Sequence, residues 1–532
     1  MASAASAAAA TAASSSVSGA ASAVRRLVLV GGGHGHVQVI KALNRSARPR
    51  NLRVTLIDLH ESASYSGMVP GCVSRLYSPD QTLIRLRPLA EWAGVDFVRG
   101  EVVDVDPDGR RVYLGDERED ESGVVNKATT MTDEGRRCVE YDAISFDIGS
   151  TTRGLLDTPG AAERAIPTRP ISELVRRIDD AESDLRKRLE SGDDDGGAGG
   201  GRGEGKGEVV RVVVVGGGPA GVELAMAMRA RWDPVVADHP RASLEIVLLD
   251  SGEELLPSES APCRSALRSV LDRRGVTVVP SASVVGIGPD EIRLGGGRPP
   301  VPYTHCIWAT GALSLPLVDV SMRRGGLAVT DRGWIRVNPS LQSISHPSVF
   351  AAGDCAEIEG LECGSRSPPK AGVYAVRSGP ILIKNLTRYL GFKDDADNGD
   401  DRLIRYRPQG DFLKLLMCGD GSALGFRFGL PLEGKWVWEM KDAIDRGFMD
   451  LFDAINLPPP GAGGTLDTEQ YDAMREKWER LSPGDAADLL RRTDDGVNYS
   501  TAWKALRDMT ADEEYKDDVL AAMGVTTEAG TA

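Results

Sequence analysis

Two glycine-rich turns, each preceded by a run of aliphatic residues, constrain how this chain folds more than any other feature. Residues 27–30 lead into the sequence GGGHGH, which starts at Gly31, and residues 212–215 lead into GGGPAG, which starts at Gly216. A buried strand, a glycine turn and a helix in this order are typical of a dinucleotide-binding unit, because the pyrophosphate must approach the backbone at the helix N-terminus. The sequence therefore predicts an α/β fold with two Rossmann-like units.

The second turn fits the pattern GxGxxG fully, with Gly216, Gly218 and Gly221 at the three glycine positions. The first glycine allows the tight turn, the second lets the backbone approach the pyrophosphate, and the third lets helix and strand pack closely. Asp250 ends the next predicted strand, where a carboxylate accepts the ribose hydroxyls of NADH and repels the 2′-phosphate of NADPH. We therefore expect NADH in preference to NADPH, while Asp250 would also suit a simple turn. The segment 305–312, which contains Gly311, closes this unit.

The first turn departs from the same pattern, because His36 stands where the third glycine is expected. Its side chain must be accommodated between helix and strand, so we expect a slightly displaced helix. His34 and His36 point in different directions on a helix, and no metal site is expected there. Two dinucleotides in one chain are usually a flavin and the nicotinamide that reduces it, so we assign FAD to this turn. The residues expected to bind it are Gly31, Gly32, Gly33, Gly35, His36 and Asp58, the acid that ends the predicted strand 53–58.

Charge and cysteine usage exclude several classes of function. The formal net charge of −15 and the pI near 5.1 disfavour nucleic acid and anionic membrane surfaces as partners. No stretch approaches the roughly 20 apolar residues that a membrane-spanning helix needs. Seven cysteines are scattered without a CxxC or CxxxxC pair, which favours a reducing compartment and argues against a redox-active dithiol.

The N-terminal residues 1–24 are almost entirely small and contain no acidic residue. This composition fits either an organellar transit peptide or a disordered tail, since no Arg or Lys precedes Arg25. We expect an intracellular protein, located in the cytoplasm or in an organelle such as a chloroplast or mitochondrion.

The remaining chain divides by composition and periodicity. We expect a discontinuous FAD-binding domain, an inserted NAD(P)H-binding domain, a C-terminal interface region of the α+β type, and an acidic helical tail. The two nucleotide domains should have the three-layer ββα arrangement, and the glycine-rich segment 193–208 should be a flexible loop between them. The expected limits are 25–165 with 335–400, then 208–334, then 401–465, and finally 466–532.

The motifs in order, a GGG turn, GGGPAGVELA, WATGA and VFAAGDCA, resemble the FAD-dependent pyridine nucleotide-disulfide oxidoreductase superfamily. Within it the chain resembles type II NADH:quinone oxidoreductases. The segments YSGMVPG (65–71), FDIGSTTRG (146–154), PPKAGVYAVRSGPILIKNL (368–386) and KWVWEMKDAIDRGFM (435–449) are most similar to the flavoprotein module found fused to selenide, water dikinase. The resemblance covers about residues 25–455.

This resemblance implies further site residues. Glu223 would lie near the nicotinamide, although a helix-surface glutamate is the alternative. Lys370 would add positive charge or line the acceptor site, unless it is a solvated lysine at a helix start. The helix that begins near Ala371 would aim its N-terminus at the flavin. Besides these, the resemblance implies FAD contacts for Tyr65 to Pro70, Gly149, Gly353 and Asp354.

The expected activity is transfer of hydride from NADH to FAD and of electrons from the flavin to a quinone-like acceptor. One alternative is a non-catalytic flavin-binding redox sensor or partner linked to selenium metabolism. Another is a sulfur- or selenium-compound reductase, which would depend on Cys72. Sulfide oxidation would need Cys72 with Cys355 or Cys363. An apolar stripe favours domain packing or homodimer contact, with peripheral membrane or quinone contact as the alternative. The stripe consists of Trp436, Trp438, Met440, Ile444, Phe448 and Phe452.

Overall fold

The structure is a computed structural model that describes most of the chain. The expected tail at 1–24 and the loop at 193–208 fall mainly outside the described residues, as does Cys363. The described residues are 23–115, 128–132, 135–194, 208–362, 366–392, 402–453, 457 and 480–525.

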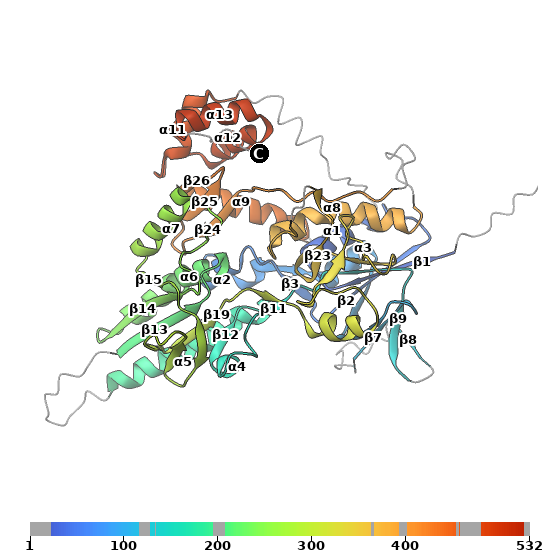
Figure 1. Cartoon of the computed structure of the whole chain (residues 1–532), viewed down its shortest axis with the longest axis horizontal. Coiled ribbons are helices and arrows are strands. Elements are labelled where there is room, and N and C mark those ends of the chain that lie inside the picture. Colours follow the sequence, from blue (N-terminus) through green and yellow to red (C-terminus); the bar gives the residue numbers. More distant parts are fainter. Residues whose placement is uncertain are drawn as a thin grey trace, which may run out of the picture.

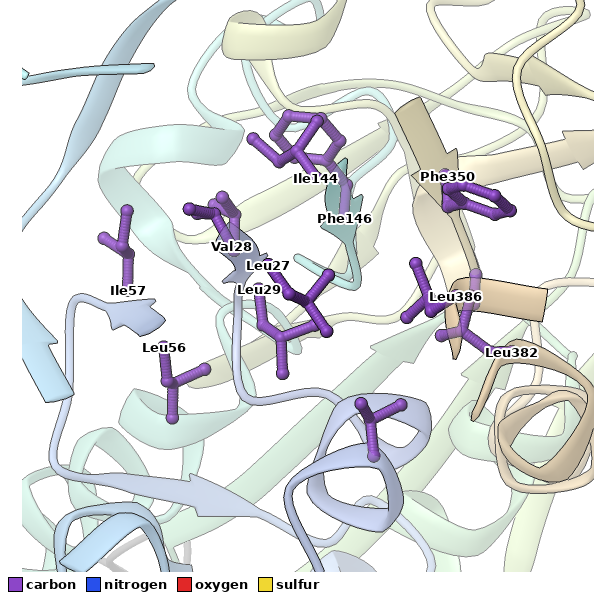
Figure 2. Packing of buried hydrophobic residues seen from close by; sticks show 14 of the residues in the cluster. Leu27, Val28, Leu29, Leu56, Ile57, Ile144, Phe146, Phe350, Leu382 and Leu386 are labelled. Carbon is purple, nitrogen blue, oxygen red and sulfur yellow. The ribbon is translucent and has the colours of Figure 1, made fainter. Parts of the chain in front are cut away.

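The first glycine turn follows the central strand of a parallel five-stranded sheet (Figure 1). Strand β1 has its neighbours in register, so that Val28 pairs with Ile144 on one side and Thr55 on the other. Both faces of the sheet are covered, with helices α1 (His34–Ala42) and α8 (Gly372–Tyr389) packed together on one of them. The aliphatic run 27–30 is therefore fully buried, as Figure 2 shows for Leu27 and Leu29. In spatial order the strands are β22 (Val349–Ala351), β10 (Ala143–Phe146), β1 (Arg25–Val30), β2 (Leu52–Asp58) and β5 (Asp96–Arg99).

The second glycine turn follows the central strand of a second parallel sheet. Strand β13 pairs with β14 on one side and with β19 on the other, just as β1 lies between β2 and β10 in the first sheet. Helix α6 (Pro219–Ala237) leaves the turn and packs against β14. The strand predicted at 53–58 is thus confirmed as β2, and the strand predicted before Asp250 as β14. The order is β12 (Ala165–Pro167), β19 (His305–Trp308), β13 (Glu208–Val215), β14 (Ala242–Leu249) and β15 (Val276–Val279).

Each of the two units also carries an antiparallel sheet. In the first, β6 and β7 form an antiparallel hairpin. Together with the parallel sheets and their helices, these strands make the α/β architecture of three-layer ββα type. The first antiparallel sheet holds β6 (Val102–Asp106), β7 (Arg111–Leu114), β9 (Arg137–Glu140) and β8 (Thr130–Met131); the second holds β16 (Val284–Ile287), β17 (Glu291–Leu294) and β18 (Val301–Pro302).

The C-terminal region combines a small antiparallel sheet with helices. Helix α9 (Lys435–Asp450) packs against β25 and β26. Three further helices lie together beside α9 and β26 (Figure 1). In the described part of the chain, no helix has both the length and the apolar character needed to cross a bilayer. The elements are β24 (Lys414–Met417), β25 (Ala423–Arg427), β26 (Leu430–Gly434), α11 (Pro483–Arg491), α12 (Tyr499–Ala511) and α13 (Glu513–Ala522).

Shorter elements connect these layers. The strand pairs β3–β4, β11–β20 and β21–β23 form three two-stranded sheets. The connecting elements are β3 (Ser62–Ser64), α2 (Val69–Val73), β4 (Leu83–Arg85), α3 (Leu86–Ala93), β11 (Thr151–Thr152), α4 (Ala161–Arg164), α5 (Ile171–Asp194), α7 (Ala261–Arg273), β20 (Ala312–Leu313), β21 (Ile335–Val337) and β23 (Ala356–Ile358).

A buried arginine on α6 joins elements of both units. Arg231 donates to Glu182 at 2.6 Å and to Asp179 at 2.5 Å, both on α5, and to the carbonyl oxygen of Val73 at the end of α2. The side chains of Arg231 and Glu182 are 2% and 4% exposed, so this pair is largely removed from water. Removing Arg231 leaves Oε2 of the buried Glu182 without this partner, while Oε1 keeps Arg75 at 2.8 Å and Arg186 at 3.0 Å.

Replacing Arg231 with methionine should therefore lower the melting temperature by about 6–12 °C, which corresponds to a loss of about 3 kcal/mol. The matched control is Arg176→Met, because Arg176 pairs with Asp180 on α5 with both side chains 64% exposed. That variant should melt close to the original protein. Equal melting temperatures for the two variants, measured by circular dichroism, would contradict the structural role of Arg231.

Candidate active site

One cavity of about 1990 Å³ extends between the two glycine turns, the start of α8 and helix α9. Ordinary ligand pockets measure about 300–1,000 Å³, so this cavity has room for more than one ligand. Most of the predicted site residues line it, although they come from distant parts of the sequence. They are Gly31, Gly32, Gly33, Asp58, Tyr65, Pro70, Gly149, Gly216, Gly218, Glu223, Asp250, Gly311, Asp354, Lys370 and Ala371. The predicted residues Gly35, His36, Gly221 and Gly353 are not part of this lining.

The second turn brings backbone, helix and strand into close approach. Gly216 has a φ of +114°, and a Cβ on Gly221 would lie 1.8 Å from the carbonyl oxygen of Gly216. A Cβ on Gly218 would meet nothing within 4 Å, so the start of α6 opens onto free space. The carboxylate of Asp250 accepts a hydrogen bond from the amide of Gly217 at 3.3 Å. The turn therefore presents a helix N-terminus next to an acid, as a bound dinucleotide requires.

In the first turn, too, a backbone amide donates a hydrogen bond to the acid that ends the next strand. Gly31 has a φ of +89°, and the amide of Gly32 donates to Asp58 at 2.6 Å. The other oxygen of Asp58 accepts from the amide of His60 at 2.7 Å. Burial raises the pKa of the Asp58 carboxyl, while the two amides oppose that shift.

His36 requires a correction to its predicted place among the cofactor-binding residues. Its ring is fully buried behind the turn, with Nδ1 2.7 Å from the carbonyl oxygen of Gly31 and Nε2 2.8 Å from Oγ of Ser145. A carbonyl only accepts, so Nδ1 carries the proton and Nε2 accepts from the serine. Burial lowers the pKa of His36 to about 4. The ring therefore fills the space between α1 and β10 and is not presented to the cavity.

A carboxyl group that the sequence reasoning missed lies at the N-terminus of α1. Asp147 is buried and accepts from the amides of Gly35 at 2.8 Å and His36 at 3.3 Å. A Cβ on Gly33 would lie 2.2 Å from Cγ of Asp147, and one on Gly353 would lie 2.5 Å from its Oδ1. Burial raises the pKa of Asp147 to about 7, and the nearby Asp354 contributes in the same direction. These glycines thus make room for a protein carboxyl as well as for a ligand.

The residues predicted to contact the flavin are held by polar partners. Asp354 accepts from Oγ of Ser150 at 2.9 Å and from Arg169 at 3.3 Å. Lys370 donates to Glu357 at 3.1 Å and to the carbonyl oxygen of Ala356. Its ammonium also lies 4.5 Å from the ring centre of Trp334, and its side chain is only 15% exposed. Lys370 is therefore a fixed charge at the cavity wall and not a freely solvated lysine.

A second missed cluster joins α9 to the segment predicted to run beside the flavin. Lys441 donates to Asp445 at 2.6 Å and to the carbonyl oxygen of Gly67 at 2.8 Å. The hydroxyl of Tyr65 donates to the other oxygen of Asp445 at 3.2 Å, and its ring stacks on Phe448 with a centroid distance of 4.9 Å. Lys441 and Asp445 are four residues apart on this helix, and that spacing was the available signal.

Glu223 lies at the junction of these elements. It begins the second turn of α6, and its Oε1 accepts from the amide of Met417 in β24 at 2.9 Å. Burial raises the pKa of Glu223 to about 7, while the charge of Lys441 opposes the shift. A carboxyl with this pKa can exchange a proton near neutral pH, which a solvated helix-surface glutamate does not do.

The cysteines do not support the sulfur-compound alternative. Cys72 and Cys355 are buried, and neither lines the cavity. The thiol of Cys355 donates to the carbonyl oxygen of Ala352 at 3.2 Å, and burial raises its pKa to about 12. These thiols therefore stay protonated and packed, and Cys363 lies outside the described residues.

Asparagine at position 147 should make the protein more stable than the original at pH 8 but not at pH 5. The pKa of this carboxyl rises from 3.8 to about 7 on folding, so the folded state holds a proton that the unfolded state releases between these values. Stability from this group is therefore lost as the pH rises through that window. Melting temperatures of Asp147→Asn without added cofactor test this. The exposed control Asp518→Asn should differ from the original equally at both pH values.

The sequence profile of the pyridine nucleotide-disulphide oxidoreductases matches residues 25–379, which is more than half of the chain. The chain belongs to this family. It is 23% identical over 346 residues to an external alternative NAD(P)H-ubiquinone oxidoreductase B3, mitochondrial, from Arabidopsis thaliana, with 63% of this chain and 55% of that protein aligned. It is also 23% identical to the type II NADH:quinone oxidoreductase of Haemophilus influenzae, with 78% and 91% aligned.

A solved structure has the same fold as this member of the family. NDH2 from Plasmodium falciparum in complex with NADH superposes with a TM-score of 0.64 at 14% identity, covering 80% of this chain and 97% of that one. By contrast, the chain spans less than two thirds of the length of several mitochondrial relatives that it matches.

Proposed function

We propose that this protein is an FAD-dependent NADH oxidoreductase that delivers electrons to a quinone. The observation that carries the proposal is the opening of two glycine turns, each at the start of a helix, onto one cavity. The relatives from Arabidopsis thaliana and Haemophilus influenzae, which are named as oxidoreductases of NAD(P)H or NADH with a quinone, support it.

The residues around each turn fit the proposed ligands. Gly31 and Gly33, the N-terminus of α1 and Asp58 would hold the adenosine half of FAD. Gly218, the N-terminus of α6 and Asp250 would hold NADH, and the carboxylate disfavours the extra phosphate of NADPH. When bound, the flavin would accept two electrons as hydride and pass them to the second substrate.

Lys370 and Glu223 are the polar residues proposed to act at the flavin end. Lys370 sits directly before the N-cap of α8, so its charge and the helix N-terminus both favour negative charge at that point. The overall reaction consumes NADH, one proton and a quinone, and it yields NAD⁺ and a quinol. Glu223 would exchange that one proton with the cavity.

Location and assembly remain part of the proposal. The mitochondrial names of the plant and yeast relatives support an organelle over the cytoplasm. For the apolar stripe on α9, burial of Trp436, Met440 and Phe452 within the chain favours domain packing. Peripheral membrane contact and a homodimer stay predictions.

Anaerobic reduction tests the proposal directly. The purified protein, supplied with FAD, should lose its absorbance near 450 nm when NADH is added and recover it when a soluble quinone follows. A flavin that binds but resists NADH would favour the redox sensor. Failure to bind FAD at all would overturn the proposal.

Alanine at position 218 should weaken NADH without disturbing the fold. A Cβ there meets no protein atom, but it would occupy the space that the pyrophosphate needs. We expect the KM for NADH to rise about tenfold, equivalent to about 1.4 kcal/mol, with FAD binding unchanged. Gly447→Ala is the control, because a Cβ on Gly447 also meets nothing and the residue lies outside the cavity. Equal KM values for both variants would remove Gly218 from the NADH site.

Glutamine at position 223 should change the pH dependence of quinone reduction. The original enzyme should slow as the pH rises above about 7, because Glu223 must be protonated to give up its proton. In Glu223→Gln the rate should be lower throughout and lack this break, whereas the exposed control Glu291→Gln should keep it. Steady-state rates between pH 5 and 9 provide the measurement. An unchanged break in Glu223→Gln would assign the proton transfer to another group.

A further inference from the structure

The two glycine turns differ at the residue that follows the neighbouring strand. In the first unit Asp147 follows β10, and its amide donates to the carbonyl oxygen of Val30 at 2.9 Å. In the second unit Ala309 follows β19, and its amide donates to the carbonyl oxygen of Val215 at 2.8 Å. The carbonyl oxygens of Asp147 and Ala309 both lie 2.4 Å from the Cβ that the first glycine of the turn would carry. The two residues are therefore equivalent in position, and the first unit has a carboxyl group where the second has a methyl group.

This difference decides what the start of each helix binds within the protein. On α1, the amides of Gly35 and His36 donate to Oδ2 of Asp147. On α6, the corresponding amides of Ala220 and Gly221 find no acceptor among the residues that the structure describes. A helix N-terminus favours an anion. The start of α1 therefore already holds a protein carboxyl where the diphosphate of FAD is proposed to bind.

One oxygen of this carboxyl is left for a ligand. Both amides donate to Oδ2, and no described residue forms a hydrogen bond with Oδ1 of Asp147. A Cβ on Gly33 would lie 2.3 Å from Oδ1 and one on Gly353 would lie 2.5 Å from it, so glycines leave this oxygen its room. Asp147 is 4% exposed and lines the cavity. Because Oδ2 already accepts two hydrogens, a proton on the carboxyl would sit on Oδ1, where it can be donated to a ligand.

The other titratable groups on α1 and after β22 that face Asp147 keep one protonation state near neutral pH. Burial lowers the pKa of His34 and His36 to about 4, so both rings are neutral. Burial raises the pKa of the Cys355 thiol to about 12, so this thiol keeps its proton. Burial also raises the pKa of Asp147 itself, to about 7. This carboxyl therefore gains or loses its proton in a range where the other three groups do not.

The charged side chains near Asp147 have other partners. Asp354 pairs with Arg169 at 3.3 Å, and Lys370 before α8 pairs with Glu357 at 3.1 Å. No lysine or arginine among the described residues forms an ion pair with Asp147. An ionised Asp147 would thus set its charge against a phosphate at the start of α1, whereas the neutral acid would donate a hydrogen bond to it.

We infer that Asp147 binds the diphosphate of FAD as a neutral acid, with the proton on Oδ1 donated to a phosphate oxygen. The inference rests on the proposed function, since it takes FAD as the ligand of the first turn. Retention of FAD then requires a proton on this carboxyl and weakens as the pH rises. Binding of NADH at the second turn carries no such requirement, because Ala309 has nothing to ionise.

Equilibrium dialysis of the full-length protein against FAD at pH 6 and pH 8.5 tests this inference. The Kd for FAD should rise about thirtyfold between these values, as expected when one proton with a pKa of about 7 must be bound. In Asp147→Asn the Kd should change by less than roughly twofold, because the amide nitrogen donates in place of Oδ1 and the amide oxygen still accepts from α1. The control is Glu223→Gln, since the pKa of Glu223 is also about 7 and this residue lines the same cavity from α6. That variant should keep the rise.

The outcomes separate this inference from the proposed function. FAD that binds equally at both pH values, or an Asp147→Asn variant that keeps the full rise, would overturn the inference and leave the proposed function intact. A rise that Asp147→Asn alone abolishes would support the inference even if NADH failed to bleach the bound flavin, a failure that would overturn only the proposed activity. An original protein that binds no FAD at either pH would overturn both.

Discussion

The approach of helix α6 to the turn before it is the constraint on which the site depends. Only a residue without a side chain fits at Gly221, because a Cβ would overlap the carbonyl oxygen of Gly216. This close packing aims the free amides at the helix start toward the cavity and not into the sheet. In the first turn, the ring of His36 holds α1 in place with one hydrogen bond to the carbonyl oxygen of Gly31 and one to Oγ of Ser145. Both solutions hold a helix N-terminus at the carboxyl edge of a parallel sheet.

Carboxyl groups lie at both glycine turns, so a phosphate that binds there comes close to negative charge. Asp58 and Asp250 each accept from a turn amide, and Asp147 takes the amides of Gly35 and His36. A phosphate that comes to the same helix start would be repelled by an ionised Asp147. The raised pKa of Asp147 reduces this conflict, because a protonated carboxyl carries no charge at moderately acidic pH. Asp147 lines the cavity, so we expect the protonation of this carboxyl to affect how strongly the flavin is retained.

The sequence predicted what depends on local pattern and missed what depends on distant contacts. Glycine spacing and aliphatic runs identified β1, β13 and their helices, because the turn needs no partner from elsewhere to reveal it. Asp147 could not be found in this way, since its hydrogen-bond partner Gly35 is 112 positions away. The same holds for Lys441, whose acceptor Gly67 is 374 positions away. The position of the His36 ring could not be predicted for a related reason, because it occupies the third glycine position of the turn while its partner Ser145 lies on β10.

Helix α9 connects the C-terminal region to the site. Its first turns bury Trp436 and Met440 against α11–α13, whereas its last turns present Asp445 and Phe448 to Tyr65. One rigid element thus contacts both the C-terminal helices and the segment beside the proposed flavin. The ion pair between Lys441 and Asp445 is buried, so a rotation of α9 would separate these two charges from their partners Gly67 and Tyr65 without exposing them to water. The wall of the cavity and the position of α12 are therefore set together, and neither can shift without the other.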